Sequence, residues 1–216
     1  MTANIRTMTD AGVSERRTNR RGHATRENML KAAVKALASG DPGAVSANKI
    51  ARDIGATWGA VKYQFGDNDG LWAAVLQFTA ERRAEVLTFA DTTAPLRQRV
   101  ADIIDTLYEG LTSTDSRAID NLRAALPREH AELEQLYPRT AAELSSWGRG
   151  WLETCQTAFA DLEVDPARVA EVAEFIPGAM RGITSERQLG TYSDLDKARR
   201  GLTNAIVAYL EDSGSR

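Results

Sequence analysis

Several features that mark whole classes of protein are scarce or absent in this chain of 216 residues. A single cysteine, Cys155, excludes an internal disulfide and is typical of a protein kept in a reducing cytosol. No apolar run approaches the ~20 residues that cross a bilayer, and the polar, basic N-terminus lacks the apolar stretch of a signal peptide. We therefore expect a cytoplasmic protein without a membrane partner.

Groups that commonly carry catalysis are also scarce. The chain has two histidines, His23 and His130, and it contains no Gly-rich phosphate loop and no cluster at metal-ligand spacing. Cys155 has no sequence neighbour that would activate its thiol. We expect no enzymatic activity, no cofactor and no metal ion.

Charge is divided unevenly along the chain, although the net charge is only −3. Residues 1–72 carry 11 Lys and Arg against 7 Asp and Glu, whereas residues 73–216 carry 16 against 23. Such a positive N-terminal part on a negative body would turn the N-terminal part toward phosphate.

Apolar residues at helical spacing recur along most of the chain, and no segment shows the alternation of a strand. The pattern predicts an all-α protein of about nine helices. We expect three parts. Residues 1–24 would be a flexible basic arm, residues 25–72 a three-helix helix-turn-helix domain, and residues 73–216 a larger helical domain.

Aspartate and proline mark several expected helix ends. Asp67 is a predicted N-cap for the fourth helix, and Asp165 followed by Pro166 predicts the start of another. Pro138 lies inside a long helical stretch over residues 133–159, which it should kink or interrupt.

The most specific pattern lies in residues 44–65, AVSANKIARDIGATWGAVKYQF, which predicts two short helices joined by a sharp turn. Gly55 supplies a position that is free to take positive φ at this turn. Thr57 can cap the second helix through its hydroxyl, and Val61 and Phe65 lie four residues apart on its inner face.

The outer face of the second helix offers cationic, aromatic and amide groups, which suits the major groove of DNA. We expect Lys62 to contact phosphate, Tyr63 to contact phosphate or a thymine methyl, and Gln64 to contact phosphate or adenine. The other candidates for DNA contacts are Ser46, Lys49, Thr57, Trp58, Ala60, Arg20 and Arg21.

Some of these candidates have an ordinary alternative. Trp58 can pack against the arm or a partner instead of a base, because aromatic residues also dominate protein interfaces. Lys49 and Lys62 can belong to a solvated helix face. Arg20 and Arg21 can belong to a solvated leader, or they can enter a minor groove beside the helix-turn-helix.

The segment resembles the DNA-binding region of the TetR family of bacterial transcriptional regulators. The family pattern before the turn, T-x-x-x-I-A-x-x-A-G-V-S, is similar to SANKIARDIGAT at Ser46–Thr57. The pattern after the turn, K-G-x-L-Y-x-H-F-x-x-K-x-x-L, is similar to WGAVKYQFGDNDGL at Trp58–Leu71. The resemblance covers roughly residues 25–76. It implies that residues 73–216 are the ligand-binding and dimerisation domain.

Three positions depart from the family pattern. Lys62 stands where the family usually has a tyrosine, Gln64 replaces a frequent histidine, and Asn68 replaces a lysine that often opens the fourth helix. The first change keeps the affinity for phosphate, while the last weakens it.

The resemblance implies a repressor that binds a pseudo-palindromic DNA operator as a homodimer. In this dimer, the last two long helices of each chain would pack together as a four-helix bundle. The sequence favours this independently, because small residues on both helices allow close approach. The alternative is that these stripes only close the core of one chain. The candidate interface residues are Val172, Ile176, Ala179, Met180, Ile183, Leu195, Ala198, Leu202, Ala205 and Tyr209.

The resemblance also implies a small-molecule effector bound inside the larger domain, and the residues favour an apolar or aromatic ligand. Each candidate can equally be plain core, since apolar residues at helical spacing need no ligand to explain them. The candidates are Ile104, Leu107, Tyr108, Leu111, Leu122, Trp147, Trp151 and Phe175. The alternative function is a helical protein-interaction adaptor without DNA binding, and an all-helical enzyme is a more remote one.

Overall fold

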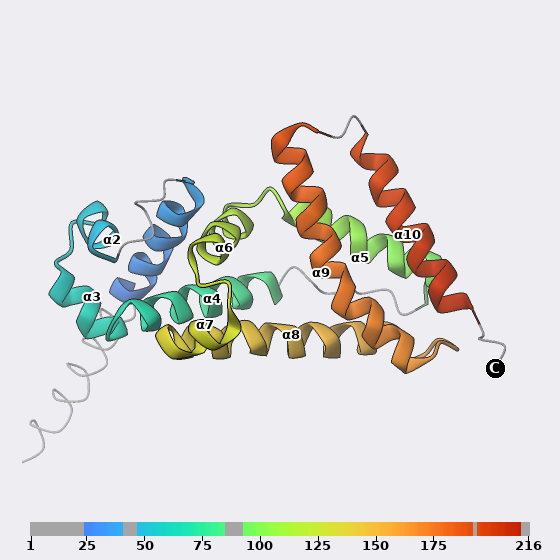
Figure 1. Ribbon diagram of the computed structural model, residues 1–216, viewed down its shortest axis with the longest axis horizontal. Helices are drawn as coiled ribbons and strands as arrows, with labels where there is room; N and C mark the ends of the chain where they lie inside the picture. Colours follow the sequence, from blue (N-terminus) through green and yellow to red (C-terminus); the bar gives the residue numbers. More distant parts are fainter. Residues whose placement is uncertain (1–23, 41–46, 85–92, 192–193, 213–216) are drawn as a thin grey trace, which may run out of the picture.

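The all-α architecture expected from the sequence is confirmed. The computed structural model describes residues 24–40, 47–84, 93–191 and 194–212, and within these ranges it contains ten helices and no strand (Figure 1). No helix within the described ranges is both long and apolar enough to cross a membrane. The first helix covers residues 24–38. The others are α2 (Ala47–Asp53), α3 (Trp58–Phe65), α4 (Asn68–Ala84), α5 (Leu96–Gly110), α6 (Thr114–Ala125), α7 (His130–Leu136), α8 (Pro138–Ala158), α9 (Pro166–Leu189) and α10 (Leu195–Glu211).

Local signals set several helix ends as the sequence predicts. The carboxylate of Asp67 accepts a hydrogen bond from the backbone N–H of Gly70 at 2.9 Å, and that of Asp165 accepts one from Ala167 at 2.9 Å. Pro138 separates α7 from α8, because a proline has no N–H to continue the first helix but fits the first position of the next. The helical stretch expected over residues 133–159 is therefore two helices. The described residues contain ten helices, whereas the sequence predicts about nine.

Buried apolar side chains form two clusters. The first core joins the first helix, α2, α3 and α4 to α6, and the second core joins α5, α8, α9 and α10. α4 and α8 pack along each other and connect the two cores (Figure 1). The boundary expected after residue 72 falls inside α4, where Leu71 and Val75 both belong to the first core. The three N-terminal helices are thus held against the larger part of the molecule by a shared core.

A largely buried arginine holds the start of α5 against the end of α8. Arg99 donates hydrogen bonds to both carboxylate oxygens of Asp161 and to the backbone oxygens of Ala94 and Ala158, the latter two at 2.8 Å. Its guanidinium is compensated in this way, as a buried charge requires. These hydrogen bonds also hold the pKa of Asp161 below its ordinary value.

Candidate nucleic-acid interface

The turn between α2 and α3 is built as the sequence predicts. Gly55 has φ = 65°, in the left-handed region that glycine enters without a steric penalty. Thr57 takes an extended conformation, and its hydroxyl oxygen accepts a hydrogen bond from the backbone N–H of Ala60 at 3.2 Å. This N-cap satisfies one of the free donors at the start of α3 and fixes the direction in which the helix leaves the turn.

α3 has one buried face and one exposed face. Val61 is 1% exposed and Phe65 is 6% exposed, and both belong to the first core. Tyr63 is 87% exposed and Trp58 is 38% exposed, and Lys62 is also exposed. Core packing therefore fixes the rotation of α3 about its axis, and the three polar or aromatic side chains are directed away from the core.

Four of the remaining candidates for DNA contacts lie within the described residues. Ala60 is half-buried and packs against the first core. Gln64 on α3 and Lys49 on α2 are half-buried, and Thr57 is exposed. The other three lie outside the described residues: Ser46, Arg20 and Arg21.

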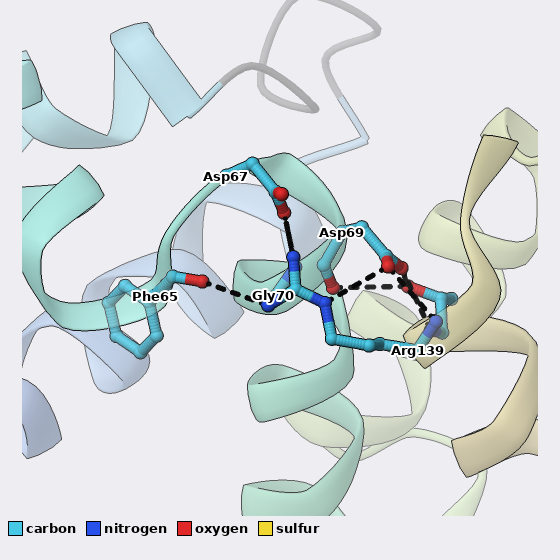
Figure 2. Close-up of polar contacts among 6 residues, drawn as sticks. Phe65, Asp67, Asp69, Gly70 and Arg139 are labelled. Carbon is cyan, nitrogen blue, oxygen red and sulfur yellow. Dashed lines mark hydrogen bonds and ion pairs between the residues drawn. The ribbon is translucent and has the colours of Figure 1, made fainter.

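A carboxylate on α4 caps the N-terminus of α8 (Figure 2). Asp69 Oδ2 accepts the backbone N–H of Arg139 at 3.0 Å, and Asp69 Oδ1 accepts the backbone N–H of Thr140 at 2.9 Å and its hydroxyl at 2.8 Å. Tyr137, the residue before α8, supplies no side-chain cap of its own. Burial tends to raise the pKa of the Asp69 carboxyl, but these hydrogen bonds outweigh burial and hold the pKa below its ordinary value.

The side chain of Arg139 extends this contact to the end of α3 (Figure 2). Its Nε donates to Asp69 at 3.2 Å, its Nη1 donates to the backbone oxygen of Phe65 at 3.4 Å, and its Nη2 pairs with Asp67. Phe65 is the last residue of α3. An arginine of α8 therefore binds the C-terminal end of the helix that carries Lys62 and Tyr63.

Gly70 lies within this cluster and leaves no room for a side chain. A Cβ atom at this position would lie 2.0 Å from the backbone oxygen of Phe65 and 2.6 Å from Nη1 of Arg139. The sequence gives no sign of this junction, since about 70 residues separate Asp69 from Arg139.

The residues expected to line an effector pocket do not share one cluster. Leu122 and Trp147 pack with the first core. Phe175 is 45% exposed and lies on the surface of α9 rather than inside the domain. The other candidates pack with the second core: Ile104, Leu107, Tyr108, Leu111 and Trp151.

The residues expected at a dimer interface differ in how far they are buried in the single chain. Four of them are buried in the second core and so hold the chain's own interior: Val172, Ile176, Met180 and Ile183. Leu195, Ala198 and Leu202 are partly buried against the same core. Ala179 is half-buried, and Ala205 and Tyr209 are exposed.

An open groove of about 270 Å³ lies between α9 and α10, and Val172, Ala205 and Tyr209 of these residues line it. Its apolar lining comes largely from Val172, Phe175, Ala205 and Ile206. The hydroxyl of Tyr209, at its edge, donates to the Glu171 carboxylate, which raises the pKa of Tyr209. Two exposed aromatic side chains thus lie on one open face of the last two helices.

The described part of the chain offers little for metal or thiol chemistry. No group of His, Cys, Asp and Glu in the described ranges could hold a metal ion. Burial raises the pKa of the Cys155 thiol to about 12, so this thiol is protonated at neutral pH.

Comparisons by sequence find no protein-family model and no curated protein that matches this chain. The fold, in contrast, matches solved structures over most of its length. A structure assigned to the TetR family of transcriptional regulators, from Rhodococcus sp., has a TM-score of 0.62 at 22% identity and covers 86% of this chain and 98% of its own. NalD, the secondary repressor of the MexAB-OprM multidrug efflux pump in Pseudomonas aeruginosa, has a TM-score of 0.63 at 20% identity, with 89% and 100% covered.

A third similar structure is the multidrug-binding protein EbrR in complex with imidazole, with a TM-score of 0.59 at 19% identity, covering 84% of this chain and 89% of its own. The helices described above therefore have the fold of TetR-family transcriptional regulators.

Proposed function

We propose that this chain is a member of the TetR family and regulates transcription by binding a duplex DNA operator as a homodimer. The exposed face of α3 carries the proposal. Lys62 and Tyr63 are directed to solvent from a helix whose other face is buried through Val61 and Phe65. The two side chains can therefore enter a DNA groove while the core packing of α3 stays intact. The likeness in fold to NalD, a repressor, supports this function.

Each exposed side chain has a distinct proposed role. Lys62 neutralises a phosphate, and Tyr63 donates to phosphate or packs on a thymine methyl. Trp58 is at the first position of α3, from which a side chain can reach base edges. The Thr57 hydroxyl oxygen already accepts from Ala60, which leaves its O–H to donate to a phosphate oxygen.

The less exposed candidates would support these contacts. Gln64 on α3 and Lys49 on α2 are half-buried, and both would bind the same strand. Ala60 would allow close approach of α3 to a base edge, since its methyl group is small. Ser46, Arg20 and Arg21 remain proposed contacts in parts of the chain outside the described residues.

We propose that a second copy of the chain covers the groove between α9 and α10. A pseudo-palindromic operator presents its half-sites about one helical turn, ~34–36 Å, apart, so two recognition helices must be held at a fixed separation. Exposed Phe175 and Tyr209 give the groove the aromatic surface that homodimer interfaces commonly contain. Ala179 and Ala205 are small enough for two helices to approach closely.

We propose that a small apolar or aromatic effector releases the protein from DNA. The effector can do so only if it binds the DNA-free arrangement more tightly than the DNA-bound one. The multidrug-binding neighbour EbrR supports a ligand-responsive body. Candidate contacts are the half-buried aromatic and aliphatic side chains of the second core, among them Leu107, Tyr108 and Trp151.

The test is a selection of binding sites from random duplexes, followed by affinity measurements at increasing salt. The affinity should fall steeply with salt, because cation release from phosphate drives binding. Lys62→Ala should weaken binding to all sequences and lower the salt slope by about 1 for each lost contact. The matched control is Lys197→Ala, which removes an exposed lysine of α10 and should change neither the affinity for DNA nor the salt slope.

Tyr63→Ala and Trp58→Ala should alter the preference between sequences as well as affinity. If the purified protein does not bind duplex DNA even at low salt and with no small molecule present, the proposal is ruled out and a helical protein-interaction adaptor is favoured. Turnover of a metabolite would favour an enzyme.

A further inference from the structure

Two polar side chains hold the first helix, α2 and α3, which we call the head, against the rest of the molecule. Asn121 on α6 donates a hydrogen bond to the backbone oxygen of Leu37 at 2.7 Å, next to the end of the first helix. Arg139 on α8 donates to the backbone oxygen of Phe65 at 3.4 Å, at the end of α3 (Figure 2). The head is therefore bound from outside at the ends of two different helices.

Both acceptors are oxygens that a helix leaves free. The last backbone oxygens of a helix have no partner within that helix, so they accept hydrogen bonds from other groups. The Leu37 oxygen also accepts the backbone N–H of Gly40, but at a longer 3.4 Å. The guanidinium of Arg139 also pairs with Asp67, the residue that caps α4. These contacts have a direction, whereas the apolar packing beside them does not, so they fix the angle of the head.

Each contact is connected to one of the two helices that line the groove. α8 has 21 residues and is about 30 Å long, with Arg139 near its start, and Trp151 further along donates to the Ala173 oxygen of α9 at 2.8 Å. α6 follows α5 after a short turn in which the Ser116 hydroxyl donates to the Gly110 oxygen at 2.9 Å, and α5 packs along α10. α9 is thus linked to the end of α3, and α10 to the end of the first helix.

We propose that Asn121 and Arg139 are positioning residues that set the spacing of operator half-sites the protein accepts. The inference rests on the proposed function, in which a second copy covers the groove and two α3 helices bind one duplex. One base pair added between the half-sites moves a half-site by about 3.4 Å along the duplex and turns it by about 35°. A head fixed at two helix ends cannot follow this movement. A head that is held at only one end can turn toward the displaced half-site at a smaller cost.

The test measures the affinity of the full chain for duplexes that carry the selected half-sites at the preferred spacing and with one base pair more or fewer. The wild type should bind the altered spacings about tenfold more weakly than the preferred one. Asn121→Ala and Arg139→Ala should each reduce this penalty to about threefold, because one of the two contacts is lost. The double variant should discriminate least between the spacings.

Two matched controls remove the same side chains elsewhere. Arg149→Ala removes an exposed arginine further along α8, and Asn204→Ala removes an exposed asparagine from α10. Neither residue contacts the head, and both variants should keep the spacing penalty of the wild type.

A second measurement separates positioning from damage to α3. In Arg139→Ala the backbone N–H groups at positions 139 and 140 still donate to Asp69, and Val61 and Phe65 still hold α3 in the first core. The preference between bases, measured on a duplex with a single half-site, should therefore equal that of the wild type. A variant that had distorted α3 would change this preference.

A distance measurement without DNA tests the same two contacts. Spin labels are attached at Arg52→Cys on α2 and Glu153→Cys on α8, since both positions are exposed, whereas the native Cys155 is buried and stays unlabelled. The spread of distances between the labels should widen in Asn121→Ala and Arg139→Ala and in neither control.

The outcomes distinguish this inference from the proposed function. If the wild type binds no duplex, the proposed function is contradicted, and the role in spacing with it. If the wild type binds duplex DNA and the two variants keep its spacing penalty, this inference alone is contradicted. A changed base preference on the single half-site, or a spread of distances equal to that of the wild type, would also overturn it.

Discussion

The indole N–H of Trp151 on α8 donates a hydrogen bond to the backbone oxygen of Ala173 on α9, at 2.8 Å. Ala173 lies four residues before Pro177, which is inside α9 and has no N–H to form the helical hydrogen bond to that oxygen. Trp151 therefore satisfies an acceptor that the proline leaves without its usual partner. A residue expected in an effector pocket thus has a structural role across a helix interface.

Trp151→Phe should lower the free energy of unfolding by about 2 kcal/mol, because the Ala173 oxygen loses its donor and the smaller phenyl ring leaves part of the space of the indole unfilled. The loss should be smaller in a Pro177→Ala background, where the backbone N–H of the new alanine can donate to the same oxygen. Urea denaturation of the wild type, the two single variants and the double variant measures how far the loss depends on Pro177. Equal losses in both backgrounds would show that the hydrogen bond is not what Trp151 contributes.

The residues that the sequence predicted well are those whose role is set by near neighbours. Gly55 is needed where the chain turns, Thr57 where a helix begins, and Pro138 where one helix ends and the next starts. Val61 and Phe65 follow from helical spacing alone. Each depends on no more than a few consecutive residues.

Contacts between distant parts of the chain could not be predicted in this way. Nothing in the residues around Arg139 indicates that it binds Asp69, and nothing around Arg99 indicates Asp161. Periodicity also identifies buried faces without saying what buries them. For this reason the sequence leaves open whether the stripe that includes Ile176 meets a partner chain or closes the core of its own chain, and in the single chain Ile176 is buried in the second core.

The Asp69 cap of α8 predicts a defined pH dependence of stability. The pKa of Asp69 is lowered in the folded protein, so its contribution is complete above the unfolded pKa of about 3.9 and is lost as pH falls through the lower folded value. Asp69→Asn should cost about 2 kcal/mol at pH 7, and this difference from wild type should shrink below about pH 4. Chemical denaturation from pH 7 to pH 2.5 measures it.

Asp53→Asn, at an exposed position at the end of α2, is the control, and its difference from wild type should stay small throughout. A difference for Asp69→Asn that stays constant down to the lowest pH would mean that the charge of Asp69 does not stabilise the junction.

Gly70→Ala should destabilise the protein by about 2–3 kcal/mol and also weaken DNA binding. The new Cβ would lie 2.0 Å from the backbone oxygen of Phe65, and a backbone atom cannot move aside as a flexible side chain can. The end of α3 must then shift, and with it Lys62 and Tyr63. The higher helix propensity of alanine, about 1 kcal/mol, does not offset this clash.

Gly59→Ala is the matched control for this prediction. A Cβ at Gly59 meets only the Thr57 hydroxyl oxygen, at an ordinary 3.7 Å, so the substitution should leave stability unchanged or raise it by up to about 1 kcal/mol. Gly70→Ala should therefore have a lower melting temperature and a weaker affinity for duplex DNA than Gly59→Ala. If Gly70→Ala is as stable as Gly59→Ala, the junction is looser than its geometry implies.

Phe175→Glu should convert the proposed dimer into a folded monomer. Phe175 is 45% exposed in the single chain, so a glutamate there is tolerated by the monomer. In a dimer that covers the groove, the same carboxylate would be buried beside Glu171, which costs about 3 kcal/mol or more and raises the dimer dissociation constant at least a hundredfold. Sedimentation across a range of concentrations measures this change.

Leu189→Glu places the same charge at the end of α9, at a side chain that is 70% exposed and does not line the groove, and it should leave the dimer intact. The two variants also separate dimerisation from recognition. Phe175→Glu should lose operator affinity at low protein concentration, because each half-site is then bound by an independent α3, while Leu189→Glu should bind as wild type does. If the Phe175→Glu protein stays dimeric, the dimer interface lies on a face other than the groove between α9 and α10.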